Sequence, residues 1–256
     1  MLLSKGSINH KMKKNIKLGY YTSSLNLAHS DLSGFNVCPI ANKLTEQENN
    51  PNKSNCSFCC VGGNGFAEVY ESVLESRINK TLTYFLDKQA FLERLAIEVN
   101  NAVKLAKKKN LKPTFRLNAY SDIRFEKDII TDNKNIFELF PEVTFYDYTK
   151  LINRKIPENY QLTYSHHKTG KFDETSTALK NGQNAAIVFE KLPKMIKIEG
   201  NNYTVINGDE TDLRIDEKIN GKAVVVGLKF KGSKKKLEKA MIEGFALGVN
   251  NPSLSY

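Results

Sequence analysis

All four cysteines of the chain fall within one short segment, which carries the clearest chemical signal in the sequence. They are Cys38, Cys56, Cys59 and Cys60, with the spacing Cys-x17-Cys-x2-Cys-Cys. Thiolates are soft ligands for zinc and iron, and a Cys-x2-Cys pair can bind a single metal ion. Cysteines that only fill a core would not all gather in one stretch. We therefore expect this segment to bind a zinc ion or an iron–sulfur cluster.

The ligand set of that site stays open at the level of the sequence. Adjacent cysteines rarely both bind one ion, so Cys59 or Cys60 is expected to be a bystander. Four thiolates, or three thiolates completed by His29 or by an exogenous group, fit the spacing equally well. The spacing alone does not separate zinc from iron–sulfur.

Polar side chains follow several of the predicted strands at the point where each strand ends. Carboxyl ends of neighbouring parallel strands meet at one edge of a sheet, where such side chains converge. One of these residues alone is more often a cap or a turn residue, but their recurrence favours a shared cleft. The residues concerned are Asn118, Asp122, Asp147, Ser165 and His166, and Arg116 is expected to line the same substrate pocket.

Two further patterns carry weaker chemistry. The VGGNG turn after the cysteines could hold an anion on its backbone N–H groups, although a simple tight turn is favoured. The GDETDLR segment could bind Mg²⁺ through its carboxylates, although a charged surface turn whose arginine pairs with its own acids is favoured. The residues are Gly62, Gly63 and Gly65 in the first pattern, and Asp209, Glu210, Asp212 and Arg214 in the second.

The balance of charge favours a polyanionic partner. The chain has 256 residues, with 38 Lys+Arg against 28 Asp+Glu and a net charge of +10. The KGSKKK stretch forms a basic patch suited to phosphate contacts, while a solvated helix start is an equal alternative. Its lysines are Lys231, Lys234, Lys235 and Lys236. We expect nucleic acid as a partner, with a lysine-rich composition of purely genomic origin as the competing explanation.

The elements that must position these residues alternate along the chain. Helical spacing of apolar residues predicts helices over 67–86 and 88–109, with Asp87 as an N-cap. Short strands then alternate with short helices, which favours an α/β fold with a mostly parallel sheet or a partial β/α barrel, preceded by a Cys-rich N-terminal segment. Strands are expected at 114–120, 143–148, 160–164, 185–189, 197–206 and 223–230. A short helix or turn is expected at 136–140, a helical turn at 151–154, a short helix at 175–181 and a basic helix at 234–244.

Composition bounds the class of protein. Hydrophobic residues make up 40% of the chain, enough for a sizeable core, and four cysteines are too few for a disulfide scaffold. No apolar run is long enough for a membrane span or a signal peptide, so we expect a cytoplasmic protein with no membrane contact. Residues 1–20 are predicted to be a loose basic arm, 21–235 a single α/β domain and 236–256 a C-terminal helix or tail. The sequence indicates no oligomeric state.

Several segments together resemble a family of phage and plasmid proteins similar to the group called gene product 88. They occur in the order GFNVCPIA, FRLNAYSDIRFEK, FPEVTFYDYTK, NYQLTYSHH, NAAIVFEKLP, VINGDETDLR and VVVGLKFKG. The resemblance covers roughly residues 20–235. It implies Cys38, Cys56 and Cys60 as the family's cysteines, and leaves Cys59 as the extra one. The polar loop between Cys38 and Cys56 is longer here than in the family pattern.

The same resemblance marks the remaining motif positions but implies no settled activity. The family's Ser–Asp–Ile, FYDYTK and acidic motifs fall on Arg116, Asn118, Ser121, Asp122, Glu126, Tyr146, Asp147, Tyr148, Lys150, Asp209, Asp212 and Arg214. His166 stands where the family places arginine, which weakens a catalytic role for the two histidines. Cysteines ahead of a β/α series are loosely similar to radical S-adenosylmethionine enzymes, so that cofactor is a weaker expectation drawn from analogy of fold.

Three functions follow as hypotheses. The first is a mobile-element enzyme with a cysteine-bound cluster near the strand ends, acting on nucleic acid or a nucleotide-derived ligand. The second is a nucleic-acid-binding accessory protein whose zinc is structural. The third is a phage counter-defence protein that binds a host protein or a nucleotide signal. We favour a metal-dependent protein acting on nucleic acid or a nucleotide-derived ligand, without assigning a reaction.

Overall fold

The computed structural model describes residues 1–4, 10–40, 70–167 and 172–256. Of the predicted metal ligands, Cys38 and His29 lie inside this part, whereas Cys56, Cys59 and Cys60 lie outside it, as do Gly62, Gly63 and Gly65. The chain divides into two compact units. The first comprises Met1–Pro39, Cys60–Asp147 and Lys155–Gln161, and the second comprises Ile40–Cys59, Tyr148–Arg154 and Leu162–Tyr256.

The first unit is built on parallel strands edged by an antiparallel one. The strands follow the order β1 (Leu3–Ser4), β2 (Tyr20–Leu25), β3 (Lys112–Arg116) and β4 (Thr144–Thr149). β2 pairs with β3, and β3 with β4, in parallel, while β1 is antiparallel to β2. The last two residues of β4 already belong to the second unit.

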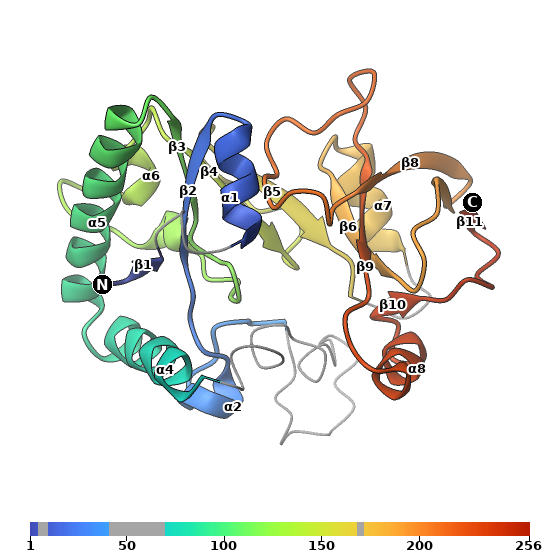
Figure 1. Cartoon of the computed structure of the whole chain (residues 1–256), viewed down its shortest axis with the longest axis horizontal. Coiled ribbons are helices and arrows are strands. Elements are labelled where there is room, and N and C mark those ends of the chain that lie inside the picture. The colour runs from blue at the N-terminus through green and yellow to red at the C-terminus, as the bar shows by residue number, and fades with distance from the viewer. Residues whose placement is uncertain (5–9, 41–69, 168–171) are drawn as a thin grey trace. The chain divides into compact units, whose positions relative to one another are not determined.

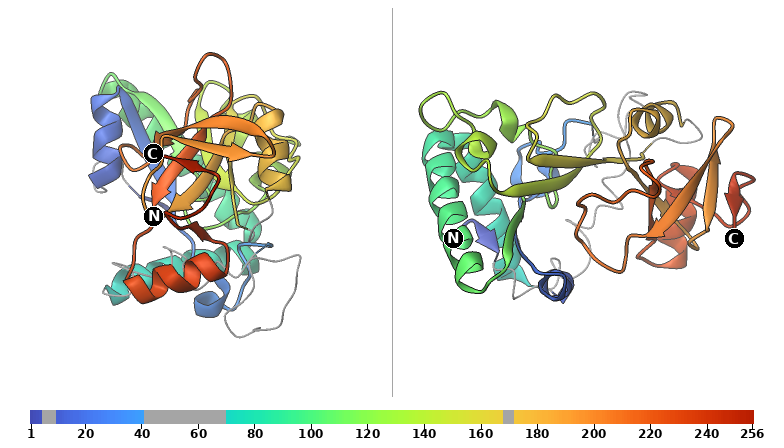
Figure 2. Two further views of the ribbon diagram at one scale, coloured as in Figure 1. Left: turned by 90° about the vertical axis from the view of Figure 1, so that its right-hand side faces the viewer. Right: turned by 90° about the horizontal axis from the view of Figure 1, so that it is seen from above.

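Helices cover and connect these strands (Figure 1). They are α1 (His10–Lys17), α2 (Ser30–Ser33), α4 (Glu71–Leu86), α5 (Lys88–Lys108), the 3₁₀ helix η2 (Phe125–Lys127) and α6 (Ile136–Leu139). Figure 2 shows α5 running beside β1 and β3. α5 begins where predicted, since the Asp87 side chain accepts a hydrogen bond from Ala90 N. Its buried face is Phe91, Leu92, Leu95, Val99, Val103 and Ala106.

The second unit has its own mostly parallel set of strands. β5 (Tyr160–Ser165), whose first two residues belong to the first unit, is followed across the sheet by β6 (Ala185–Phe189), β9 (Val225–Lys229), β8 (Asn201–Asn207), β7 (Met195–Ile198) and β11 (Leu254–Ser255). The β5–β6, β6–β9 and β9–β8 pairs are parallel. β10 (Ala246–Leu247) also pairs with β6 in parallel. The helices are α7 (Asp173–Lys180) and α8 (Lys234–Ile242).

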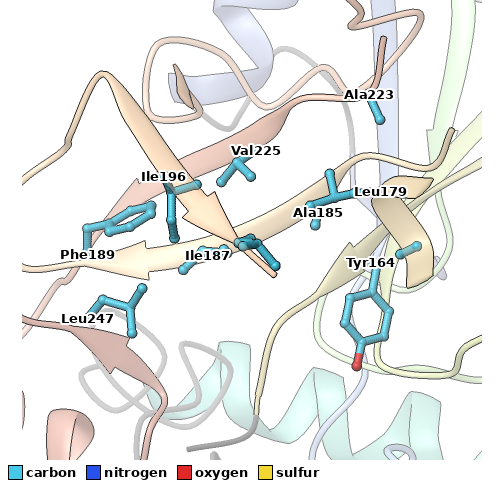
Figure 3. Close-up of a cluster of buried hydrophobic side chains, with 11 residues drawn as sticks. Tyr164, Leu179, Ala185, Ile187, Phe189, Ile196, Ala223, Val225 and Leu247 are labelled. Atoms are coloured by element: carbon cyan, nitrogen blue, oxygen red, sulfur yellow. The ribbon is translucent and has the colours of Figure 1, made fainter. Parts of the chain in front are cut away.

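A hydrophobic cluster holds the second unit together (Figure 3). Ile187 and Phe189 of β6 pack with Val225 of β9 and Ile196 of β7, all at most 1% exposed. The predicted strand 185–189 is confirmed to the residue. Its almost continuous apolar run is typical of a strand buried on both faces, as in parallel sheets.

The α/β class with a mostly parallel sheet is confirmed, with local differences. Residues 1–20, expected as a loose arm, contain β1 and α1 and lead into β2. The single strand expected over 197–206 is instead the β7–β8 hairpin, because Glu199 and Gly200 both take positive φ values of 44° and 83°. Two left-handed residues form the tight turn that joins antiparallel strands. Residues 151–154 contain no helix.

Candidate functional site

The loop that follows β3 is organised by one asparagine side chain. Asn118 Oδ1 accepts hydrogen bonds from Ser121 Oγ at 2.7 Å and from Ile123 N at 2.8 Å, and its Nδ2 donates to Ile123 O at 2.9 Å. Asparagine that bonds nearby backbone in this way competes with the strand ladder. The strand therefore ends at Arg116 rather than at the predicted residue 120.

Cys38 lies against this same loop. Asp122 N donates to Val37 O at 2.8 Å, and the Cys38 thiol donates to Tyr120 O at 3.8 Å. The side chain of Asn36 accepts from Cys38 N at 2.8 Å, which fixes the local backbone. The one predicted thiolate ligand in the described residues is thus held beside the carboxyl end of β3.

Asp147 is an acid of the first unit whose pKa is strongly shifted. Its side chain is fully buried on β4, and its Oδ2 accepts hydrogen bonds from Leu117 N at 3.0 Å and Tyr160 Oη at 3.1 Å. Its Oδ1 lies 3.7 Å from Arg116 Nε. Burial raises the pKa of Asp147 to about 7, although the positive charge of Arg116 and the hydrogen bonds oppose the rise. A carboxyl group in this range can exchange a proton near neutral pH.

The other predicted residues of this edge share the burial of Asp147. Arg116 is 8% exposed and its guanidinium lies 5.9 Å from the centre of the Tyr146 ring, while Asp122 is 5% exposed. Asn118 reaches the same network by donating to Tyr160 Oη at 3.3 Å. The structure therefore joins Arg116, Asn118 and Asp147 in one network, and places Asp122 in the loop against which Cys38 lies.

Tyr160 is a further member of this network, and no pattern in the sequence predicts its role. It opens β5, where its ring stacks on Phe137 at a centroid distance of 4.3 Å. In the sequence, Tyr160 stands out only as a hydroxyl-bearing residue at the start of the predicted strand 160–164. Such a hydroxyl needs a polar partner when the ring is buried.

Ser165 and His166 belong to the second unit. Ser165, the last residue of β5, accepts a hydrogen bond from Lys150 Nζ at 2.9 Å. His166 Nδ1 is hydrogen-bonded to Thr175 Oγ1 at 2.8 Å. Burial, assisted by the charges of His167 and Lys150, lowers the pKa of His166 to about 3. Lys150 lies in the FYDYTK motif, but nothing in its spacing marked it as the partner of Ser165.

Two of the predicted metal ligands, Cys38 and His29, lie in the described residues. Across residues 1–4, 10–40, 70–167 and 172–256, no group of three or more His, Cys, Asp or Glu side chains is placed to hold a metal ion. His29, the predicted alternative ligand, precedes α2, and its Nδ1 lies 3.5 Å from Asp31. Burial lowers the pKa of His29 against the opposing charge of Asp31, which favours the neutral imidazole that metals bind. The chemistry of Cys38 and His29 fits a soft metal.

The GDETDLR segment begins as a partly exposed turn, but its arginine is buried. Arg214 is 3% exposed and donates to Tyr148 Oη at 2.7 Å, to Thr211 O at 2.7 Å and to Gly208 O. Its ion pair is with Glu217 at 2.9 Å, so the expected pairing with the acids of the motif itself is not the principal one. A buried guanidinium needs this many acceptors because each unpaired donor would be costly.

The lysines of the basic patch divide into two kinds. Lys231 pairs with Asp209 at 2.7 Å. Lys234, Lys235 and Lys236 are exposed in the first turn of α8, which begins after the Ser233 cap. Only the second kind combines exposure with a regular helical arrangement.

Comparison with known proteins identifies one family. The family model described as gene product 88, a phage-type family, matches residues 1–243. No curated protein and no solved structure matches the chain. In the described residues, no helix has both the length and the apolar character needed to cross a membrane. Because the family model matches well over half of the residues, the chain belongs to the gene product 88 family.

Proposed function

We propose that this protein holds a zinc ion or an iron–sulfur cluster and acts on nucleic acid or on a nucleotide-derived ligand. Cys38, Cys56 and Cys60 are the proposed ligands, with Cys59, His29 or an exogenous group in the fourth position. Three protein ligands leave one position open, and an open position is what distinguishes a reactive site from a structural one. A cluster would supply electrons, whereas zinc would supply a Lewis acid.

The contact between the Cys38 segment and the loop after β3 carries this proposal. Asp122 N donates a hydrogen bond to Val37 O, and the Cys38 thiol donates one to Tyr120 O. A metal bound by Cys38 would therefore adjoin the carboxyl end of a parallel strand, where α/β proteins commonly bind ligands. The neighbouring Arg116–Asp147 pair adds a cation and a proton-exchanging carboxyl to the same unit.

The ligand class rests on charge. Arg116 stands near this edge, and the chain carries a net charge of +10. Guanidinium groups and a basic surface suit phosphate-bearing ligands. S-adenosylmethionine remains a weaker candidate, because the cysteine spacing differs from the Cys-x3-Cys-x2-Cys pattern that such enzymes use.

Metal analysis of untagged protein, purified without oxygen, tests the proposal. We expect stoichiometric zinc, or iron with a broad absorption band near 400 nm. Serine substitutions of Cys38, Cys56 and Cys60 should each abolish retention of the metal. Cys59→Ser tests the fourth position in the same segment: loss of the metal would make Cys59 the fourth ligand, and retention would leave that position to His29 or an exogenous group. Metal-free wild-type protein, or equal retention in all four variants, would contradict the proposal.

The exposed lysines of α8 favour a second candidate, a nucleic-acid-binding accessory protein whose zinc is structural. Three consecutive lysines in one helical turn can contact a phosphate backbone. This candidate requires zinc and no turnover, and binding that weakens steeply as salt rises. Red-brown, iron-loaded protein would exclude it in favour of the first.

A further inference from the structure

At one edge of the first unit, two segments that contain no acidic residue lie side by side. Neither residues 1–30 nor residues 99–121 include an aspartate or a glutamate. β2 and β3, which belong to these two segments, pair in parallel with Tyr20 opposite Lys112. Lys112 N also donates a hydrogen bond to Gly19 O at 2.9 Å, so both strands begin at the same edge of the sheet.

Each of these strands is preceded directly by the C-terminal end of a helix. α1 ends at Lys17 and α5 ends at Lys108. Short turns through Gly19, with a φ of 85°, and Asn110, with a φ of 55°, lead from the helices into the strands. Figure 1 shows both connections at the top of the picture. The last turns of the two helices are therefore held close to the first residue pair of β2 and β3.

Lysines occupy this edge, and we call them the lysine cluster. Its members are Lys14, which is partly buried, and the exposed residues Lys13, Lys17, Lys107, Lys108, Lys109 and Lys112. Among the described residues none of them forms an ion pair, whereas Lys88, Lys180 and Lys231 each pair with a carboxylate. Lys112 Nζ instead lies 5.8 Å from the centre of the Tyr20 ring, which is partly exposed. This contact joins the two segments through their side chains.

The clustering of like charges at this edge has only a partial explanation within the fold. Like charges repel one another and oppose the compact state. Lysines in the last turns of α1 and α5 interact favourably with the negative ends of the helix dipoles. That effect does not explain Lys112, which lies in β3, or the lack of acids in both segments. A bound polyanion would offset the repulsion of the whole cluster.

We infer that the lysine cluster binds the phosphate backbone of a nucleic acid. Ammonium groups from two adjacent segments can contact several phosphates and release their counterions. Such contacts carry no sequence information, so binding should not depend on base sequence. The partly exposed ring of Tyr20 offers a surface on which a base of a single strand can stack, which favours nucleic acid over a lipid surface.

This inference rests on the part of the proposed function that names nucleic acid, and it does not depend on the metal. It concerns the first unit, whereas the lysines of α8 belong to the second. Glu142, which lies two residues before β4, limits the cluster on the side of that strand.

Fluorescence anisotropy with single-stranded DNA, measured across a salt series on the full-length protein, tests the inference. The test variant carries glutamine at three exposed positions of the cluster, Lys17, Lys109 and Lys112. The slope of log affinity against log salt should fall by about two, because each lost phosphate contact removes about 0.7 for a single strand. The loss should be equal for two oligonucleotides of unrelated sequence.

The matched control carries glutamine at Lys88, Lys180 and Lys231, three exposed lysines that already pair with carboxylates. It removes the same formal charge, and its slope should change by less than about one. Circular dichroism checks that both variants fold. An equal change of slope in the two variants, or wild-type protein that binds no oligonucleotide at low salt, would overturn the inference.

Acetylation of wild-type protein, followed by mass spectrometry, gives a readout that needs no variant. Bound oligonucleotide should protect the lysine cluster from the reagent and leave Lys88 and Lys180 reactive. Protection of the cluster by phosphatidylserine vesicles but not by oligonucleotide would make the partner a membrane surface and the inference wrong. Duplex DNA and RNA of the same sequence, compared with the single strand, identify which backbone the cluster prefers.

The metal proposal and this inference fail separately. Metal-free wild-type protein that still binds oligonucleotide through the cluster would contradict the metal site and support the surface. Metal-loaded protein that binds no oligonucleotide would overturn the surface alone.

Discussion

Asp147 and Arg116 form a buried ion pair that stops short of a hydrogen bond, with 3.7 Å between Oδ1 and Nε. The other carboxylate oxygen of Asp147 accepts two hydrogen bonds, from Leu117 N and Tyr160 Oη. The carboxylate is thus stabilised on one side and only weakly on the other. Because burial dominates, the charge on this pair changes near neutral pH.

The pH dependence of stability should reveal this group. The folded pKa of about 7 exceeds the ordinary value of 3.8, so the folded state binds more protons between these limits. The free energy of unfolding contributed by Asp147 is therefore largest below about pH 4 and falls as pH rises to about 7. Relative to wild type, Asp147→Asn should gain on the order of 4 kcal/mol across that window.

Urea unfolding at half-unit pH steps measures this difference. Asp132→Asn is the control, because Asp132 is exposed and its φ of 49° suits asparagine equally. Its stability should run parallel to that of wild type at every pH. A parallel profile for Asp147→Asn as well would show that Asp147 titrates normally.

Tyr160→Phe should distinguish the contribution of the hydroxyl to stability from that of the ring. The ring stacks on Phe137 and would keep that contact, while Asp147 would lose one of its two Oδ2 donors. We expect a loss of about 1–2 kcal/mol in the free energy of unfolding above pH 7, and less below pH 5, where Asp147 is neutral. Urea denaturation at the two pH values gives both numbers. An equal loss at both would mean that the hydroxyl acts through Asn118 alone.

Strands that bury polar side chains are not predictable from patterns in the sequence. β2 contains Thr22, Ser23 and Ser24, all at most 2% exposed, so it has neither the alternation nor the apolar run of a predictable strand. Its hydroxyls are satisfied by partners distant in sequence, as in the 2.8 Å bond between Thr22 and Thr114. In contrast, the apolar strand 185–189 and the capped helix after Asp87 are local patterns, and both were predictable.

In the candidate site too, residues that lie close in the sequence were predictable, whereas residues that meet only in the folded chain were not. Asn118 and Asp122 were predictable as a group because they share one post-strand loop. Tyr160 and Lys150 were not, because their roles depend on side-chain contacts with Asp147 and Ser165 across the fold. The spacing of residues along the chain does not predict such contacts.

His166 gives the opposite pH dependence to Asp147. Its folded pKa of about 3 lies below the ordinary 6.5, so the folded state favours the neutral ring. Its contribution to stability is present above pH 6.5 and is lost as pH falls toward 3. The free energy of unfolding of His166→Asn, measured in urea, should therefore fall less than that of wild type between pH 6.5 and pH 3. Thr175→Val keeps the imidazole, so its stability should still fall with acid as that of wild type does. At neutral pH it should lose about 1 kcal/mol in the free energy of unfolding.

Arg214 should be among the most sensitive positions of the second unit. Removal of its guanidinium would take one hydrogen-bond donor from the carbonyls of Gly208 and Thr211 and would remove the cation that pairs with Glu217. We expect Arg214→Met to cost about 3–5 kcal/mol in the free energy of unfolding. Arg94→Met, at an exposed helix position paired with Glu98, should cost less than about 1 kcal/mol. Comparable losses in the two variants would show that the buried contacts of Arg214 stabilise the fold no more than an exposed ion pair does.

The two kinds of lysine in the basic patch should contribute unequally to nucleic-acid binding. Lys231, which is also exposed, pairs with Asp209 before α8 begins, whereas Lys234, Lys235 and Lys236 lie together in the first turn of α8. Each lysine that contacts phosphate adds about 0.7–0.9 to the slope of log affinity against log salt. Glutamine at all three exposed positions should lower the slope for an oligonucleotide by about two, while Lys231→Gln should change it little. Fluorescence anisotropy across a salt series measures both. Because Lys231→Gln removes one positive charge from the same patch, a slope change equal to one third of the triple variant's would show that net charge, rather than the helical arrangement, governs binding.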